Sequence, residues 1–345
     1  VLLEESAVVG YSAAAVEHLA KDLDASRLSF GSIPEFDPVP FLDERTREVY
    51  EHPIRRARLS QGVPEDVPKV RVRAGAAGRV AFLEKLDEAG RLGFIDEADA
   101  LPGLGSGALA IPKDLRKDRL ILDSRPFNTV EETEVRWLSS MGTASCLCGM
   151  ILEENEVILM SGEDIRDFFY SFVVGKERLR RNAFAMTVHP EQVQHFGCFR
   201  PWMRQSRALV PCLATMAMGD CQAVAVGQTS HLAVILRAGG VDLSELLVMK
   251  GQIPRSKFFA GLVLDDLIAL EIVAKDAWEA NRLDSARSHD FLLRAHAAYE
   301  EAKLPRHPDK GFKLESVASF WGITVDGAAG TAQTLSLIHI SEPTR

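Results

Sequence analysis

The chain has 345 residues, enough to bury one large hydrophobic core or two smaller ones. Hydrophobic residues make up 46% and charged residues 26% of it, as in ordinary soluble globular proteins, and no apolar run approaches the length of a membrane span. The net charge of −9 argues against a protein that coats nucleic acid non-specifically.

Both ends of the sequence are unusual. The chain begins at Val1 without a methionine, which indicates a fragment, and residues 1–60 are acidic and punctuated by proline. We expect these residues to form an extension that partly wraps another surface. The final stretch "LSLIHISEPTR" (335–345) matches the translation of a sequencing-library adapter, so we exclude it from fold and function as a non-native tail.

Cysteine usage and the absence of a visible signal peptide indicate the compartment. The five cysteines include no Cys-x-x-Cys pair and stand mostly in apolar stretches. We therefore expect reduced thiols in an intracellular protein, either cytoplasmic or nuclear.

The first regular elements are predicted between residues 80 and 132. Apolar side chains at Val80, Leu83, Leu86 and Leu92 have helical spacing. The stretch "ALAIPKDLRKDRLILDSRPFN" (108–128) predicts two strands joined by a basic loop. Thr129 and Glu132, in "TVEE", have the spacing of a capping box and predict that a helix begins there.

The middle of the chain alternates strands and helices. "EVILMSGEDIRDFFYSFVV" (156–174) predicts an apolar strand that runs into Asp164 and Asp167, followed by an aromatic cluster. "RALVPCLATMAMG" (207–219) predicts another strand. "GDCQAVAVGQTSHLAVILRAGG" (219–240) predicts a helix that ends at two glycines.

Asp265 and Asp266 stand side by side within the apolar run "FFAGLVLDDLIALEIV" (258–273). Such a pair is typical of a tight turn, although the Gly, Asn, Ser or Pro that usually accompany it are missing. The flanks predict two buried or half-buried strands. A lone carboxylate there would cost roughly several kcal/mol unless it were protonated or paired. A divalent cation is therefore the second interpretation, because hard cations take oxygen ligands.

The remainder predicts a long charged helical region (274–304) and a final hairpin (313–327). The order strand–helix–strand–strand–helix–strand predicts an α+β fold, with a split βαβ antiparallel sheet and helices on one face. Three basic clusters, at 69–73, 113–119 and 176–181, suggest a groove that follows a phosphate backbone.

The order of these motifs resembles the fingers and palm of a right-hand polymerase, the reverse transcriptase of LTR retrotransposons and related retroelements, over roughly residues 75–330. In the basic hairpin, the resemblance assigns Lys113, Arg119 and Arg125 to the binding of the incoming triphosphate. Such a ligand needs cations, and Arg offers a forked contact where Lys offers a point charge. In "GEDIRDFFYSF" it implies that Asp164 is a metal ligand. It places Phe169 at the steric gate, the bulky side chain that excludes a ribose 2′-OH.

The later blocks match less closely. "MAMGDCQAVAVGQ" matches with Gly219 and Gln222, which the resemblance assigns to substrate binding, but Gly227 replaces an aromatic residue. The Asp-Asp block has Val263 where the family has Tyr or Phe. "HPDKGFK" and "FWGITVDG" resemble the closing blocks, and imply that Lys310 protonates or steadies the leaving pyrophosphate.

The resemblance implies a two-metal nucleotidyl transfer. Asp164, Asp265 and Asp266 would be catalytic and hold two Mg²⁺ (or Mn²⁺) ions for an in-line transfer from a dNTP to a primer 3′-OH. The implied partners are an RNA or DNA template with its primer and the dNTP, with no membrane. Family members continue into a thumb and usually an RNase H domain, both missing from this sequence. The expected organisation is an extension (1–60), fingers (61–128), palm (129–330, with about 173–205 returning to the fingers) and a tail (331–345).

Two other functions stay open. A decayed retroelement relic would keep the fold and bind nucleic acid without catalysis, which Val263 and the altered third block favour. An unrelated two-metal phosphohydrolase would use the same carboxylates, but it would need no triphosphate clamp.

Overall fold

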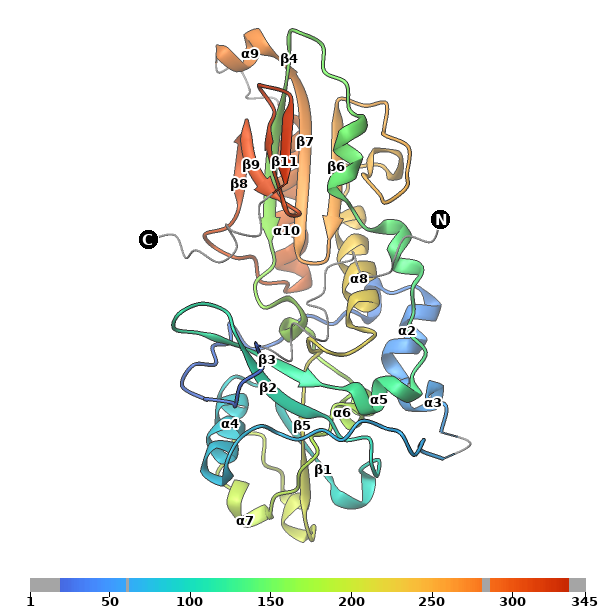
Figure 1. Cartoon of the computed structure of the whole chain (residues 1–345), viewed down its shortest axis with the longest axis vertical. Coiled ribbons are helices and arrows are strands. Elements are labelled where there is room, and N and C mark those ends of the chain that lie inside the picture. The colour runs from blue at the N-terminus through green and yellow to red at the C-terminus, as the bar shows by residue number, and fades with distance from the viewer. Residues whose placement is uncertain (1–18, 60–61, 281–285, 335–345) are drawn as a thin grey trace. The chain divides into compact units, whose positions relative to one another are not determined.

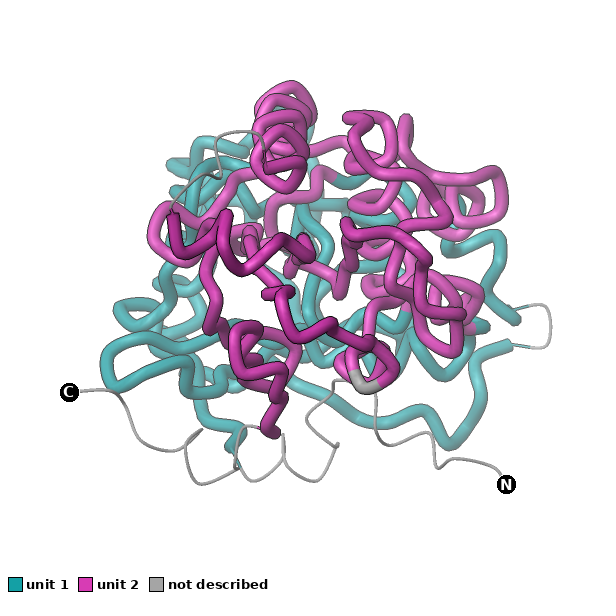
Figure 2. The backbone as a smooth tube through the Cα atoms, turned by 90° about the horizontal axis from the view of Figure 1, so that it is seen from above, with its two compact units in different colours: residues 1–34, 52–132, 174–221 teal, residues 35–51, 133–173, 222–345 magenta. Residues whose placement is uncertain are grey.

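The computed structural model describes residues 19–59, 62–280 and 286–334, which form two compact units (Figure 2). Unit 1 comprises residues 1–34, 52–132 and 174–221, and unit 2 comprises residues 35–51, 133–173 and 222–345. The extension expected over residues 1–60 is therefore divided between the two units.

Unit 1 contains two small antiparallel sheets and short helices. Strand β1 (Leu92–Asp96) pairs with β5 (Leu209–Leu213), and β2 (Gly107–Pro112) pairs with β3 (Asp118–Asp123). The predicted helix over 80–92 is confirmed as α4, although it ends before the last predicted position. The helices are α3 (Pro53–Arg56), α4 (Ala76–Glu88), α5 (Arg125–Val130), α6 (Lys176–Arg181) and α7 (Pro190–Val193), with 3-10 turns η3 (Glu97–Asp99) and η7 (Pro201–Gln205).

The basic loop between β2 and β3 is held by its own aspartate. The side chain of Asp114 accepts hydrogen bonds from the backbone N–H groups of Arg116 (2.7 Å) and Lys117 (2.8 Å). Short acidic side chains favour such turns because they bond the backbone two or three residues on. The predicted strand, loop and strand are therefore confirmed.

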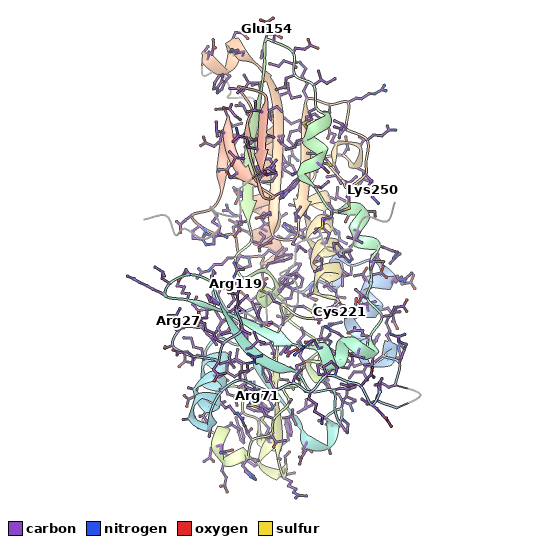
Figure 3. The ribbon with its side chains drawn as sticks, in the orientation of Figure 1. Arg27, Arg71, Arg119, Glu154, Cys221 and Lys250 are labelled. Atoms are coloured by element: carbon purple, nitrogen blue, oxygen red, sulfur yellow. The ribbon has the colours of Figure 1, made fainter. Side chains whose placement is uncertain are left out.

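The described part of the extension packs on this hairpin within unit 1. Asp118 is buried at the start of β3 and forms ion pairs with Lys21 at 2.7 Å and with Arg27 at 2.9 Å (Figure 3 labels Arg27). Burial opposes ionisation of Asp118, but the hydrogen bonds and charges of the two cations lower the pKa of its carboxyl. An acidic strand end thus binds two residues of the N-terminal segment.

Unit 2 is built on a four-stranded antiparallel sheet in the order β6-β7-β4-β8 (Figure 1). Its strands are β4 (Glu156–Asp164), β6 (Phe258–Val263), β7 (Asp266–Ala274) and β8 (Phe312–Glu315). A second sheet has the order β11-β10-β9, with β9 (Val317–Phe320), β10 (Ile323–Asp326) and β11 (Thr331–Thr334). The helices are α2 (Glu44–Glu51), α8 (Ala223–Ala238), α9 (Lys275–Glu279) and α10 (Arg287–Ala302), with η2 (Val39–Phe41), η4 (Arg136–Ser140), η5 (Ala144–Gly149), η6 (Phe168–Ser171) and η8 (Leu243–Glu245).

The two faces of the larger sheet have different covers (Figure 1). Neighbouring residues of a strand point to opposite faces. Phe258 packs against Phe291 of α10, with ring centroids 5.4 Å apart, whereas Phe259 lies in a core cluster with Phe320 and Ile323 of the smaller sheet. Helices α8 and α10 therefore share one face and the smaller sheet covers the other. The expected mixture of helices and antiparallel sheet is confirmed.

Two local predictions differ from the structure. Thr129 does not begin a helix: it lies in α5, and its hydroxyl donates to Arg125 O within that helix at 2.8 Å. The capping-box prediction is wrong because α5 starts earlier, where Pro126 stands in the first turn and needs no hydrogen-bond partner for its nitrogen. The expected helical region over 274–304 forms two helices, α9 and α10, and residues 281–285 between them lie outside the described residues.

The C-terminal boundary also differs. Residues 331–334, which the expected tail includes, form β11 and pair with β10. Residues 335–345 lie outside the described residues. None of the helices in the described ranges combines the length and the apolar character needed to cross a membrane.

Candidate active site

The two adjacent aspartates lie at the tip of the β6–β7 hairpin. Val263 pairs with Asp266, so Leu264 and Asp265 form a two-residue loop between strands that are confirmed on both sides. Leu264 has φ 55, a left-handed conformation that is uncommon outside glycine. We call residues 263–266 the Asp-Asp turn. Both interpretations of the sequence meet here, since the pair stands in a turn and also lies beside the carboxylate of Asp164.

Asp164 joins the pair from the neighbouring strand. In the β4–β7 ladder Asp164 lies directly opposite Asp266, and the Ile165 N–H donates to Asp265 O at 3.0 Å. Directly opposite residues of an antiparallel pair have Cβ atoms about 4.5–5.5 Å apart on the same face. Asp164, Asp265 and Asp266, which we call the aspartate trio, therefore gather at one end of the larger sheet.

The charges of the trio act on one another. Burial, together with the negative charges of Asp265 and Asp164, raises the pKa of Asp266 to about 7, although Lys310 acts to lower it. Lys310 places its Nζ 2.7 Å from Oδ2 of Asp164, which is 14% exposed. Carboxylates that repel one another in partly buried positions are suited to a bound cation, because a metal removes the repulsion. The residues present therefore fit a divalent cation.

A second acidic group belongs to unit 1. Among the described residues, the three whose ligand atoms all lie within 4.8 Å of one another are Glu131, Asp220 and Cys221, rather than the aspartate trio (Figure 3 labels Cys221). Two arginines with fully buried side chains already neutralise this group. Arg178 lies 2.6 Å from Asp220, and Arg181 lies 3.1 Å from both Asp220 and Glu131. We interpret it as an internal ion-pair network, which we call the arginine cluster.

Arg181 shows how strongly the arginine cluster is compensated. Burial alone would lower the pKa of its guanidinium, but Asp220 and Glu131 raise the pKa above its ordinary value. Two positive charges already oppose the two carboxylates, so a further cation there would meet repulsion.

The predicted triphosphate-binding residues lie on unit 1. Lys113 and Arg119 are exposed on the β2–β3 hairpin (Figure 3 labels Arg119). Arg125 begins α5 and donates two hydrogen bonds to Asp123, at 2.7 and 2.8 Å. Two of the three cations therefore extend into solvent, and the third has a carboxylate partner within its own unit.

Two predicted substrate-binding residues make close contacts within the protein. Gly219 has φ 106, and a Cβ there would lie 2.0 Å from Leu122 O, so only glycine fits. The side chain of Gln222 is fully buried in unit 2 and accepts a hydrogen bond from the Glu134 N–H at 3.0 Å.

The predicted steric gate, Phe169, is half-buried beside Phe168, with ring centroids 5.3 Å apart. A Cβ on Gly227 of α8 would lie 2.8 Å from Phe168 Cε1 and 3.1 Å from Phe169 Cε1. Glycine at position 227, where the family has an aromatic residue, therefore makes room for these two rings. Of this aromatic cluster, Phe168 and Tyr170 are buried as expected for core packing.

Sequence reasoning missed three residues around the Asp-Asp turn. Gln228 and His231 of α8 bond the backbone of Leu264, and Tyr299 of α10 bonds His231. All three side chains are buried. The available signal was the presence of Gln and His three residues apart in a helix of small apolar residues, because buried polar side chains need partners.

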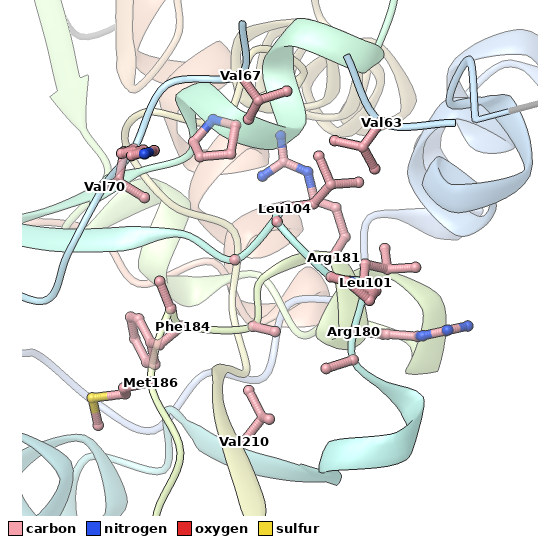
Figure 4. A pocket seen from close by; sticks show the side chains of 18 of the residues that line it. Val63, Val67, Val70, Leu101, Leu104, Arg180, Arg181, Phe184, Met186 and Val210 are labelled. Atoms are coloured by element: carbon pink, nitrogen blue, oxygen red, sulfur yellow. The ribbon is translucent and has the colours of Figure 1, made fainter. Parts of the chain in front are cut away.

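Unit 1 also contains a pocket of about 830 Å³ (Figure 4). Its lining is mainly apolar, with Val63, Val67, Leu101 and Phe184 around the side chain of Arg181. Of the predicted site residues, all of which are described, none lines this pocket. The pocket and the aspartate trio are thus separate features of the chain.

These elements define a reverse-transcriptase-like fold. Two solved structures of the foamy viral protease-reverse transcriptase share it with this chain. That of the dRH form in complex with dsDNA has a TM-score of 0.50 and 13% identity, over 86% of this chain and 42% of the other. A second dsDNA complex has a TM-score of 0.50 and 13% identity, over 84% of this chain and 48% of the other. This chain thus spans less than half the length of either protein.

Identity at this level shows the fold alone. No family model and no curated protein matches the sequence. Function therefore has to be argued from the site.

Proposed function

We propose that this chain is the fingers and palm of an RNA-directed DNA polymerase, the reverse transcriptase of a retroelement. The observation that carries the proposal is the aspartate trio, at the tip of a hairpin and on the strand beside it, in a reverse-transcriptase-like fold. Burial and the neighbouring charges of Asp265 and Asp164 raise the pKa of Asp266 to about 7. Perturbed acids of this kind cluster at functional sites.

The trio would hold two Mg²⁺ or Mn²⁺ ions. When bound, such ions stabilise the attacking and leaving oxygens of an in-line phosphoryl transfer and lower the pKa of the primer 3′-OH. Asp164 and Asp266 would supply oxygen ligands from two adjacent strands, and Asp265 would supply them from the turn. Lys310, 2.7 Å from Asp164, is half-exposed and is the proposed donor of a proton or a charge contact to the leaving pyrophosphate.

Unit 1 would act as the fingers and unit 2 as the palm. The exposed cations Lys113 and Arg119 would bind the triphosphate of the incoming dNTP, and Phe169 would exclude a ribose 2′-OH. The similar foamy viral proteins were solved with dsDNA, which supports a template with its primer as the partner. In this proposal the whole protein also has a thumb and an RNase H domain.

Primer extension by the full chain tests the proposal. We expect Asp265→Asn to lower dNTP incorporation by about 10³-fold or more, because the ligand contributes several kcal/mol to the transition state. Asp167→Asn is the matched control, since Asp167 lies three residues from Asp164 and its left-handed φ of 48 suits asparagine. Equal incorporation by wild type and Asp265→Asn would contradict the proposal.

A nucleic-acid-binding relic is the second candidate. Val263 in place of the family's aromatic residue favours it, as does the pairing of Arg125 with Asp123. The relic hypothesis predicts that wild type binds primer–template without incorporating dNTP, in Mg²⁺ or in Mn²⁺. Binding should then be insensitive to Asp265→Asn and should weaken when Lys113 and Arg119 are both replaced by Gln.

A further inference from the structure

The backbone of Leu264 has a conformation that L-residues rarely adopt. Its φ of 55 falls in the left-handed region, directly before Asp265. This conformation is unfavourable for a non-glycine residue and persists only where its surroundings hold it. The contacts of Leu264 therefore have to stabilise the turn.

Two side chains of α8 bond both peptide groups of Leu264. The Leu264 N–H donates to Oε1 of Gln228 at 2.9 Å, and Nδ1–H of His231 donates to Leu264 O at 2.6 Å. Gln228 and His231 are three residues apart and so lie on the same face of the helix. Nε2 of Gln228 donates to Ser140 O and Leu262 O, both at 3.2 Å, which determines the orientation of its amide.

Tyr299 determines the state of His231. Because Leu264 O can only accept, Nδ1 of His231 carries the hydrogen and Nε2 accepts one from the Tyr299 hydroxyl at 2.8 Å. Burial lowers the pKa of His231 to about 4 and raises the pKa of Tyr299 well above its ordinary value. Both groups are therefore neutral at physiological pH, and the direction of both hydrogen bonds is defined.

We propose that Gln228, His231 and Tyr299 form a clamp that holds the Asp-Asp turn in the conformation in which the aspartate trio binds divalent cations. They are positioning residues, since they act through the backbone of Leu264. The role of the metal rests on the proposed function, whereas the clamp's hold on the turn does not. Groups that orient metal ligands typically contribute about 10- to 100-fold to metal affinity.

Titration of the full chain with Mn²⁺, followed by electron paramagnetic resonance, measures the first consequence. His231→Leu removes both hydrogen bonds and should raise the Kd for Mn²⁺ about 10-fold or more. His231→Asn should stay within about threefold of wild type, because its Nδ2 is attached to Cγ as Nδ1 is and can donate to Leu264 O. A merely structural role would not predict this rescue.

Ser230→Ala is the matched control. Ser230 is buried on the same helix, and its hydroxyl donates to Val226 O of that helix at 2.7 Å. Its loss should leave the Kd for Mn²⁺ unchanged. If His231→Leu and Ser230→Ala have the same Kd, the clamp does not position the metal ligands and the proposal is overturned.

Hydrogen exchange at Leu264 tests the clamp without a metal. In His231→Leu the Leu264 amide should exchange at least about 10-fold faster, while amides in the middle of β6 and β7 keep their wild-type rates. Unchanged exchange at Leu264 overturns the proposal. Tyr299→Phe serves if His231→Leu does not fold. It removes one hydroxyl and should raise the Kd about threefold, by the loss of one neutral hydrogen bond.

The two proposals fail in different ways. If wild type shows no Mn²⁺ binding that Asp265→Asn abolishes, the proposed function fails, and hydrogen exchange alone decides whether the clamp holds the turn. If wild type binds Mn²⁺ and the His231 variants match it in both measurements, the clamp fails and the proposed function stands.

Discussion

The arginine cluster of unit 1 has buried carboxylates and the aspartate trio of unit 2 has partly buried ones, and the two groups differ in how those charges are neutralised. In the arginine cluster, two arginines with fully buried side chains meet Asp220 and Glu131 at 2.6 to 3.1 Å. In the trio, the half-exposed Lys310 lies beside Asp164 and lowers the pKa of Asp266, yet burial and the neighbouring carboxylates still raise that pKa to about 7. The charges of the first group are offset by two arginines, whereas Lys310 does not offset the effect of burial and repulsion on Asp266.

The difference supports a structural role for the arginine cluster and the metal-binding role that we propose for the aspartate trio. A balanced buried cluster needs no external partner, because each charge already has a counter-charge. An unbalanced acidic group costs stability, and a protein tolerates such a cost where ligand binding requires it. Of these two acidic groups, the more closely spaced is therefore the less suited to a metal.

The largest expected effect is the removal of a counter-charge from the arginine cluster. Asp220→Asn leaves Arg178 and Arg181 under-compensated and should lower the free energy of unfolding by about 3–5 kcal/mol. Urea denaturation of the full chain measures it. Glu35→Gln is the control, since Glu35 and Lys303 form an exposed pair and its loss should cost less than about 1 kcal/mol. If the two variants lose similar amounts of unfolding free energy, the buried ion pairs do not contribute more to stability than the exposed pair, and the prediction is wrong.

Asp266→Asn should raise the free energy of unfolding, whereas Asp220→Asn should lower it. The pKa of Asp266 is raised to about 7 from 3.8, so the native state holds the extra proton and the free energy of unfolding falls as pH rises from about 4 to 7. At pH 8 the variant should be more stable than wild type by about 2–4 kcal/mol, with the difference vanishing near pH 4. Urea denaturation at several pH values measures this. Destabilisation at pH 8 would show that the trio is not under repulsion.

His231 should make the free energy of unfolding depend on pH in the direction opposite to Asp266, and by a smaller amount. Its pKa is lowered to about 4 from 6.5, so the unfolded state takes up the proton first, and the free energy of unfolding falls as pH drops below about 6.5. Protonation of His231 should account for about 2–3 kcal/mol of the fall in the free energy of unfolding between pH 7 and pH 4. In His231→Asn this contribution should disappear. The measurement is the difference between variant and wild type at the two pH values. If the difference in the free energy of unfolding between variant and wild type is the same at pH 7 and pH 4, His231 is not buried in its neutral form.

The smallest expected effect belongs to Lys310. Its side chain is 55% exposed, so Lys310→Met should change the free energy of unfolding by less than about 1 kcal/mol. Because Lys310 lowers the pKa of Asp266, its loss should move the decline in stability that is linked to Asp266 to higher pH. Lys310→Arg should keep the wild-type profile. If Lys310→Met leaves the pH dependence of the free energy of unfolding unchanged, Lys310 does not affect the charges of the trio.

Predictions based on local patterns were confirmed where local forces decide the structure. The apolar runs at residues 156–164 and 258–274 predicted the strands that carry the trio, because a short continuous apolar run is typical of a strand that is buried on both faces. The two glycines after residue 238 ended α8 as expected, since both adopt positive φ. The predicted helix start at Thr129 was wrong because of another local signal: Pro126, three residues earlier, favours a helix start before Thr129.

The sequence alone determined the strands, the turn and the order of the motifs, because these follow from side-chain periodicity and from residues close together in the chain. Only the tertiary structure decided which charges are compensated, since Arg178 meets Asp220 across 42 positions and His231 meets Tyr299 across 68. It also buried Gln222 against Glu134, 88 positions away. The energy of a carboxylate or a histidine depends on the groups around it, and packing brings those groups together from distant parts of the chain.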